Sequence, residues 1–136
     1  MRAVFKLLLL LTSLVLAVPA NADDSMTAPE ALALVQAHAV ALVDVRTPAE
    51  WAETGIPAGA GTVSWGQPDF VPGILALTQG DRNAPLVLIC RTGNRSVRAL
   101  AALRENGFTQ VRHVGEGMGG SAAGPGWLAR GLPVTR

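Results

Sequence analysis

The chain has 136 residues, of which 49% are hydrophobic and 15% are charged, and its formal net charge is +1. This length fits one domain, and the apolar content excludes a disordered tail or a collagen-like fibre. No run of like charges is present, which argues against a nucleic-acid-binding arm or a polybasic membrane patch. The single cysteine excludes an intramolecular disulfide and a multi-cysteine zinc site.

The N-terminal segment has the three parts of an export signal. Two basic residues precede the apolar stretch 7–18, and an Ala-Asn-Ala sequence ending at Ala22 follows it. The apolar stretch is too short to cross about 30 Å of hydrocarbon as a helix. We therefore expect residues 1–22 to be a cleavable signal peptide and residues 23–136 to form the domain. The mature protein would be periplasmic or secreted, with no stable membrane anchor after cleavage.

A capping box predicts the first helix of the domain. Thr27 and Glu30 have the spacing with which a hydroxyl and a carboxylate satisfy the free N–H groups of a helix start. We expect this helix to extend as far as His38. The short apolar run Ala41–Val45 that follows predicts a strand.

A second capping box, formed by Thr47 and Glu50, predicts a short helix with a proline at its first position. We expect this helix to end near Gly55, since glycine commonly terminates helices. Residues 62–65 predict a further strand. Residues 70–79 predict a helix, although they include a proline and a glycine.

The second half of the chain again alternates strands with helices. Residues 86–90 form the most hydrophobic strand candidate, apolar on both faces as a central strand covered by helices should be. An amphipathic helix is predicted over 96–106, ended by Gly107, and a last strand over 111–114. A glycine-rich loop, 115–126, comes next. This alternation predicts an α/β fold with a mostly parallel sheet.

The residues at the end of the central strand form the candidate site. Ligands of α/β sheets bind beyond the carboxyl ends of the strands, and Cys90 lies there, just before a helix. The loop N–H groups and the helix dipole favour an anion such as a thiolate, which is the nucleophilic form of cysteine. Gly93 and Asn94 tolerate the positive φ angles of such a cradle, and Arg91 and Arg95 add positive charge for an anionic substrate. The alternative is an inert, buried cysteine in a strand–helix turn.

Other polar residues have structural interpretations. Asp44 and Arg46 are two positions apart at a strand end and so face the same side, where we expect a structural hydrogen-bond network. The two histidines, His38 and His113, lie in unrelated segments, and no metal site is predicted. Met118, in the glycine-rich loop, either lines the pocket mouth or fills a gap in the core.

Three segments resemble the rhodanese superfamily, specifically its single-domain sulfurtransferases. Residues 42–60 resemble the opening motif, 86–96 the active-site loop, and 116–134 the closing segment. The resemblance implies a single rhodanese-like α/β domain, with about five mostly parallel strands and helices on both faces. It also implies that the Cys90 thiolate takes a sulfane sulfur from a small anionic donor such as thiosulfate, releasing sulfite. The resulting persulfide would pass its sulfur to cyanide or a thiol, and no cofactor is needed.

This chemistry assigns roles to one continuous loop. Cys90 would be the nucleophile and sulfur carrier, and its anion would be stabilised by the backbone N–H groups that follow, in the manner of an oxyanion hole. We expect the substrate to be held by the residues after the cysteine: Arg91, Thr92, Gly93, Asn94, Arg95 and Ser96. Asp44 and Arg46 would support the site without taking part in the chemistry.

Two other functions use a cysteine loop of this kind. A sulfur carrier without turnover of its own, loaded and emptied by protein donors and acceptors, would use the same Cys90 persulfide, with the loop 115–126 as a docking surface. A phosphatase or arsenate reductase relative is disfavoured, because those families place five residues between cysteine and arginine. Four residues separate Cys90 from Arg95, and a tighter loop suits a sulfur atom better than a phosphoryl or arsenate group.

The export signal predicts that the mature protein starts at Asp23, because cleavage follows the small residue Ala22. N-terminal sequencing of the secreted or periplasmic protein checks this. Recovery of a membrane-bound chain that still starts at Met1 would contradict it.

Overall fold

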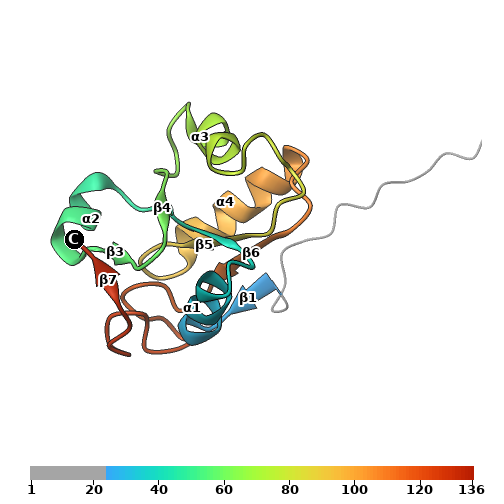
Figure 1. Ribbon diagram of the computed structural model, residues 1–136. Helices are drawn as coiled ribbons and strands as arrows, with labels where there is room; N and C mark the ends of the chain where they lie inside the picture. The colour runs from blue at the N-terminus through green and yellow to red at the C-terminus, as the bar shows by residue number, and fades with distance from the viewer. Residues whose placement is uncertain (1–23) are drawn as a thin grey trace, which may run out of the picture.

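In the computed structural model, residues 24–136 are described, so the predicted signal peptide and its cleavage site lie outside the described residues. Parallel strands form a five-stranded sheet in the order β1-β6-β5-β2-β4 (Figure 1). This confirms the predicted α/β fold and its parallel sheet. The strands are Ser25–Met26 (β1), Ala41–Asp44 (β2), Gly61–Thr62 (β4), Leu86–Ile89 (β5) and Val111–Val114 (β6).

The connections between the strands contain helices. Both predicted capping boxes are present: the Thr27 hydroxyl accepts the N–H of Glu30, and the Thr47 hydroxyl accepts that of Glu50, each at 3.3 Å. The helices are Ala28–Gln36 (α1), Pro48–Thr54 (α2), Phe70–Leu77 (α3) and Asn94–Glu105 (α4). Among residues 24–136, no helix combines the length and the apolar character that a membrane span requires.

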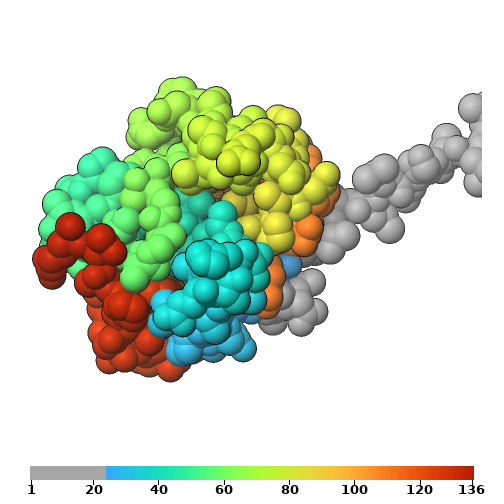
Figure 2. Space-filling view, viewed as in Figure 1, coloured from blue at the N-terminus to red at the C-terminus, as the bar shows by residue number. Residues whose placement is uncertain are grey.

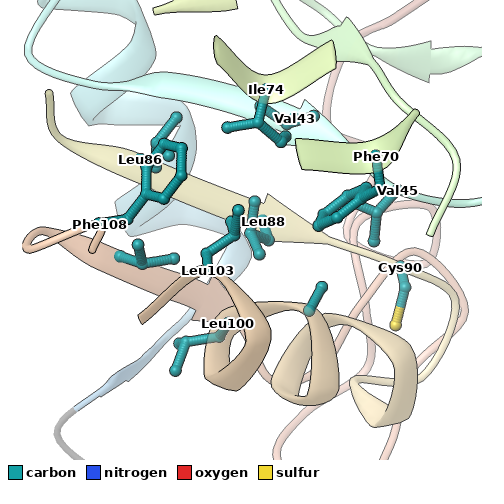
Figure 3. Packing of buried hydrophobic residues seen from close by; sticks show 12 residues of the cluster. Val43, Val45, Phe70, Ile74, Leu86, Leu88, Cys90, Leu100, Leu103 and Phe108 are labelled. Atoms are coloured by element: carbon teal, nitrogen blue, oxygen red, sulfur yellow. The ribbon is translucent and has the colours of Figure 1, made fainter. Parts of the chain in front are cut away.

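The two faces of the sheet bury separate hydrophobic clusters, because successive strand side chains point to opposite faces. Val43 and Leu88 pack against α3 and α4, together with Phe70, Ile74 and Leu103 (Figure 3). The other face is covered by α1 and the C-terminal loop and contains Leu42, Val87, Ile89, Met118 and Trp127. The same alternation places Cys90, two residues after Leu88, on the α4 side of the sheet.

Helix α1 ends two residues before the predicted end at His38. His38 has φ 55°, and the N–H of Ala39 bonds to the carbonyl of Leu34 at 2.9 Å. This is a closure of the Schellman type, in which one residue in the left-handed conformation terminates the helix. The sequence offered no glycine at this position to mark the end.

Strand β4 is shorter than the predicted strand 62–65. Its ladder with β2 covers Gly61–Thr62, but the edge contact continues beyond it. The N–H of Val63 bonds to Asp44 O at 3.2 Å, and the N–H of Trp65 bonds to Val45 O at 2.9 Å. The predicted residues therefore follow β2 without forming a regular ladder along their length.

A small antiparallel sheet, which the sequence did not predict, attaches the C-terminus to the domain. It joins Ile56–Pro57 (β3) to Val134–Thr135 (β7). Figure 2 shows the red C-terminal segment lying against the green segment that follows α2. The indole N–H of Trp127 donates to Pro133 O at 3.0 Å and fixes the same segment from the core side.

Candidate active site

The thiol of Cys90 lies in a cradle at the start of α4, and its side chain is 0% exposed. Its Sγ accepts the backbone N–H groups of Gly93 at 3.2 Å and Ser96 at 3.4 Å. The Ser96 hydroxyl lies 3.5 Å from the same sulfur. Because the two N–H donors and the N-terminus of α4 converge on one atom, the cradle is arranged to hold a negatively charged sulfur.

Gly93 gives the loop its shape. It has φ 90°, a left-handed conformation at the N-cap of α4, which side chains disfavour. A Cβ added at Gly93 would also overlap the carbonyl oxygen of Gly115. The neighbouring side chains of Thr92 and Asn94 are exposed, with Asn94 as the first residue of the helix.

The glycine-rich loop holds the backbone of the loop formed by residues 90–96, here called the cysteine loop. The N–H of Met118 donates to Cys90 O and that of Gly119 donates to Arg91 O, both at 2.8 Å. A Cβ at Gly117, which has φ 63°, would overlap the Arg91 carbonyl. The role of this loop, which the sequence left open, thus includes direct support of the cysteine loop.

A buried carboxylate fixes the glycine-rich loop in turn. Glu116 is 1% exposed and accepts the N–H of Ala28, at the start of α1, at 3.3 Å. Its two oxygens also accept bonds of 2.6 and 2.9 Å from the Arg130 guanidinium. This carboxylate therefore links the loop to α1 and to the C-terminal segment.

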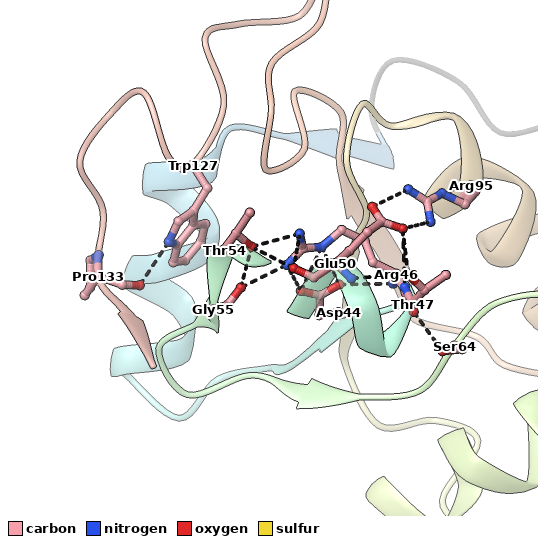
Figure 4. Close-up of polar contacts among 10 residues, drawn as sticks. All are labelled: Asp44, Arg46, Thr47, Glu50, Thr54, Gly55, Ser64, Arg95, Trp127 and Pro133. Carbon is pink, nitrogen blue, oxygen red and sulfur yellow. Dashed lines mark hydrogen bonds and ion pairs between the residues drawn. The ribbon is translucent and has the colours of Figure 1, made fainter. Parts of the chain in front are cut away.

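Asp44 and Arg46 form a buried ion pair at the end of β2, with Arg46 NH2 2.7 Å from Asp44 Oδ2. Arg46 also donates to Gly55 O and to the Thr54 hydroxyl, both at 3.0 Å (Figure 4). The pair thus connects the end of β2 to the end of α2. These contacts are those of the structural network that the sequence predicted for the two residues.

Arg95 is bound to Glu50 of α2. Its two terminal nitrogens lie 2.6 and 2.9 Å from the two carboxylate oxygens (Figure 4). The hydrogen bonds from Arg95 lower the pKa of Glu50 from 4.5 to about 2, with further lowering from the nearby positive charge and from Thr47. Both terminal nitrogens of Arg95 thus face Glu50, whereas the side chain of Arg91 is exposed.

A cavity of about 220 Å³ lies beside the cysteine loop. Its lining includes Arg91, Glu50 and Leu128, so charged and apolar groups share one hollow. Met118 lines this cavity and also belongs to the buried core, with 1% exposure. Met118 thus takes the core position that was one of the two alternatives considered from sequence, and it also borders this cavity.

His113 also lies near the thiol, although no motif in the sequence connected it to the site. Its Nδ1 lies 2.8 Å from the Ser96 hydroxyl, which contacts Cys90 Sγ. Burial lowers the pKa of His113, and the charge of Asp24 opposes this effect. The order of the elements could have indicated this position. Helix α4 connects β5 to its neighbour β6, so its first turns pack over both strands and lie near His113 of β6.

Among residues 24–136, no group of three or more histidine, cysteine, aspartate or glutamate side chains is arranged to hold a metal ion. The site described above consists of a thiol, backbone N–H groups, a hydroxyl and an imidazole. These groups can bind an anion and carry out nucleophilic chemistry at sulfur.

Residues 27–122 match the Rhodanese-like domain family. The chain belongs to the rhodanese superfamily. It is 32% identical over 115 residues to a sulfurtransferase of Allochromatium vinosum, an alignment covering 85% of this chain and 94% of that protein. This rhodanese-like domain thus has a relative of nearly its own length, and the family assigns it a sulfurtransferase-type or sulfur-carrier role.

Solved structures share the fold of this rhodanese-like domain. The polysulfide-sulfur transferase homodimer of Wolinella succinogenes aligns with TM-score 0.63 and 29% identity, covering 83% of this chain and 80% of that one. A Rhodopseudomonas palustris protein of unknown function, described as a possible tyrosine phosphatase, aligns with TM-score 0.63 and 27% identity. That alignment covers 82% of this chain and 83% of the other.

We expect Glu50→Gln to destabilise the domain by about 1 kcal/mol at neutral pH, because the ion pair with Arg95 is partly exposed to solvent. The pKa of Glu50 is lowered from 4.5 to about 2 in the folded protein. The ion pair therefore stabilises the domain fully above pH 4.5 and loses this effect as the pH falls toward 2. The difference in the free energy of unfolding between wild type and Glu50→Gln should therefore shrink over that pH range. Urea unfolding at several pH values measures it.

The matched control is Glu53→Gln, which removes an exposed carboxylate from the same helix. Equal pH dependence of stability in the two variants would contradict the role assigned to Glu50.

Proposed function

We propose that this protein is a sulfurtransferase that moves a sulfane sulfur from a small anionic donor, such as thiosulfate, to cyanide or a thiol. The observation that carries the proposal is the cradle around Cys90, in which two N–H groups donate to one sulfur atom. The similarity to a sulfurtransferase and to a polysulfide-sulfur transferase supports the same class of reaction.

The proposed reaction has two steps at Cys90. In the first, the thiolate attacks the outer sulfur of thiosulfate, the S–S bond of the donor breaks, and sulfite leaves with the bonding electrons. In the second, a cyanide or thiolate acceptor attacks the outer sulfur of the Cys90 persulfide and regenerates the thiolate. The N–H groups of Gly93 and Ser96 stabilise the sulfur anion before and after transfer.

The size of the cradle favours transfer of a single sulfur atom. The Cys90 side chain is 0% exposed, and its sulfur is surrounded closely by the turn that begins α4. A phosphatase would need an arginine free to bind the phosphoryl oxygens, but both terminal nitrogens of Arg95 are engaged by Glu50. The geometry therefore favours sulfur over phosphoryl chemistry.

In this proposal, Arg91 attracts the anionic donor. Its side chain is exposed and lines the 220 Å³ cavity next to the cysteine loop. Arg95 contributes positive charge near the site, reduced by its carboxylate partner. A sulfur carrier would use the same persulfide. The rate of turnover with small donors and acceptors distinguishes a sulfurtransferase from such a carrier.

Cys90→Ser should abolish sulfur transfer and leave the fold intact, because serine is close in size to cysteine but is a poor sulfur nucleophile at neutral pH. The chain contains no other cysteine to replace it. Thiosulfate:cyanide activity measures turnover, and intact-protein mass spectrometry after thiosulfate treatment measures the added sulfur atom. Activity near wild type in this variant would exclude the proposed nucleophile. A stable persulfide on the wild type with negligible turnover would indicate a carrier.

Arg91→Ala should lower kcat/KM for thiosulfate by about tenfold at low ionic strength, since a charge-assisted contact with an anion is lost. If Arg91 attracts the donor from a distance, the loss should shrink as salt rises, because the Debye length falls to about 3 Å at 1 M. Steady-state kinetics at low and high ionic strength provide the measurement.

Arg112→Ala, which removes another exposed arginine from β6, controls for the change in net charge. Full activity of Arg91→Ala at low salt would show that the backbone N–H groups hold the donor without this arginine.

A further inference from the structure

A line of hydrogen-bonding groups leads from the buried thiol to an imidazole. Cys90 Sγ and the Ser96 hydroxyl are 3.5 Å apart, and that hydroxyl is 2.8 Å from Nδ1 of His113. The cysteine and the serine are both 0% exposed, and the histidine is 8% exposed. Three side chains from β6, α4 and the end of β5 thus form one connected group inside the domain.

Burial creates a chemical requirement at this site. A thiol at the surface can release its proton to water, but the side chain of Cys90 is not exposed. The nucleophilic form is the thiolate, so the proton needs an acceptor within reach. His113 is the titratable group that the described hydrogen bonds connect to the sulfur.

The geometry of Ser96 allows it to pass a proton on. A serine hydroxyl has one proton and can accept at the same time as it donates. Its oxygen is 3.1 Å from the Gly93 carbonyl and 2.8 Å from His113 Nδ1, and this nitrogen, the nearer partner, accepts in the tautomer that leaves Nδ1 without a proton. The hydroxyl can therefore accept from the thiol while it donates to the imidazole.

We propose that His113 receives the proton of the Cys90 thiol through the hydroxyl of Ser96, which leaves a thiolate and an imidazolium in the same site. The S–H bond of Cys90 breaks as a new O–H bond forms at Ser96. The original O–H bond of Ser96 breaks as an N–H bond forms at Nδ1 of His113. No electron is gained or lost, and the net charge of the site does not change. This proposal depends on the proposed function in one respect only, namely that the thiolate serves as the nucleophile in sulfur transfer.

The surroundings of His113 fit a proton acceptor. Burial lowers its pKa, which favours the neutral imidazole that can accept a proton but works against the imidazolium that results. Asp24, just before β1, favours the imidazolium by its charge and is itself paired with Arg104 of α4. From β5, the position paired with His113 is the apolar Leu88. The N–H groups of Gly93 and Ser96 stabilise the thiolate that remains.

The test is a titration of the thiolate by its ultraviolet absorbance, with Cys90→Ser as the blank. The chain suits this measurement, because it has one cysteine and no tyrosine. In His113→Asn, the amide oxygen can still accept a hydrogen bond from Ser96 but cannot take up a proton. We expect the midpoint of thiolate formation to move upward by about one pH unit or more in His113→Asn and in Ser96→Ala. The double variant should show no larger shift, because both changes interrupt the same path.

The matched control is His38→Asn, which removes the other histidine of the chain from an exposed, left-handed position that asparagine tolerates. Its midpoint should equal that of the wild type. Unchanged midpoints in both site variants would overturn the proposal. A shift in His113→Asn without one in Ser96→Ala would also overturn it, because the hydroxyl would then not carry the proton.

A second measurement follows the imidazole itself. If Cys90 and His113 share a proton, each affects the pKa of the other. Removal of the thiol in Cys90→Ser should therefore lower the pKa of His113 measured by NMR. An unchanged His113 titration would overturn the proposal. Neither measurement uses a sulfur donor, so this proposal can fail while Cys90 still forms a persulfide, and it can succeed while sulfur transfer fails.

Discussion

Two backbone hydrogen bonds between loops hold the site in place: Met118 N–H to Cys90 O, and Gly119 N–H to Arg91 O. They occupy the carbonyl groups of the cysteine loop from outside, while the N–H groups of the same loop turn inward to the sulfur. A peptide chain can present its donors to one side only if its acceptors find partners elsewhere. The glycine-rich loop supplies those partners, and its glycines allow the close approach that such bonds need.

The parts of the fold that could be predicted from sequence are those with a local chemical cause. The capping boxes at Thr27 and Thr47 each satisfy N–H groups within one helical turn, so their residues are close together in the sequence. The two-residue strands β1, β3 and β7 have no such cause, because each exists only through a distant partner. The end of α1 at Gln36 was likewise hidden, since His38 adopts a conformation more often taken by glycine.

The candidate site shows the same division. The position of Cys90 follows from the order of a buried strand and a helix, and both elements were visible in the sequence. The contacts of Arg95 and Ser96 were not visible, since Glu50 and His113 lie on other elements. Glu50 completes the capping box of α2, as the sequence predicts, but its carboxylate also binds Arg95. The local role of Glu50 at the start of α2 could therefore be predicted from sequence, but its second role as the partner of Arg95 could not.

The solitary, enclosed thiol has a consequence for how a cycle of sulfur transfer could end. A protein with a second cysteine nearby can discharge a persulfide internally, by forming a disulfide and releasing the sulfur as sulfide. This sequence offers no resolving thiol, and its one thiol is buried. A sulfur atom loaded onto Cys90 would therefore depart only when a second molecule collects it, so the supply of that molecule would govern how long the loaded state lasts.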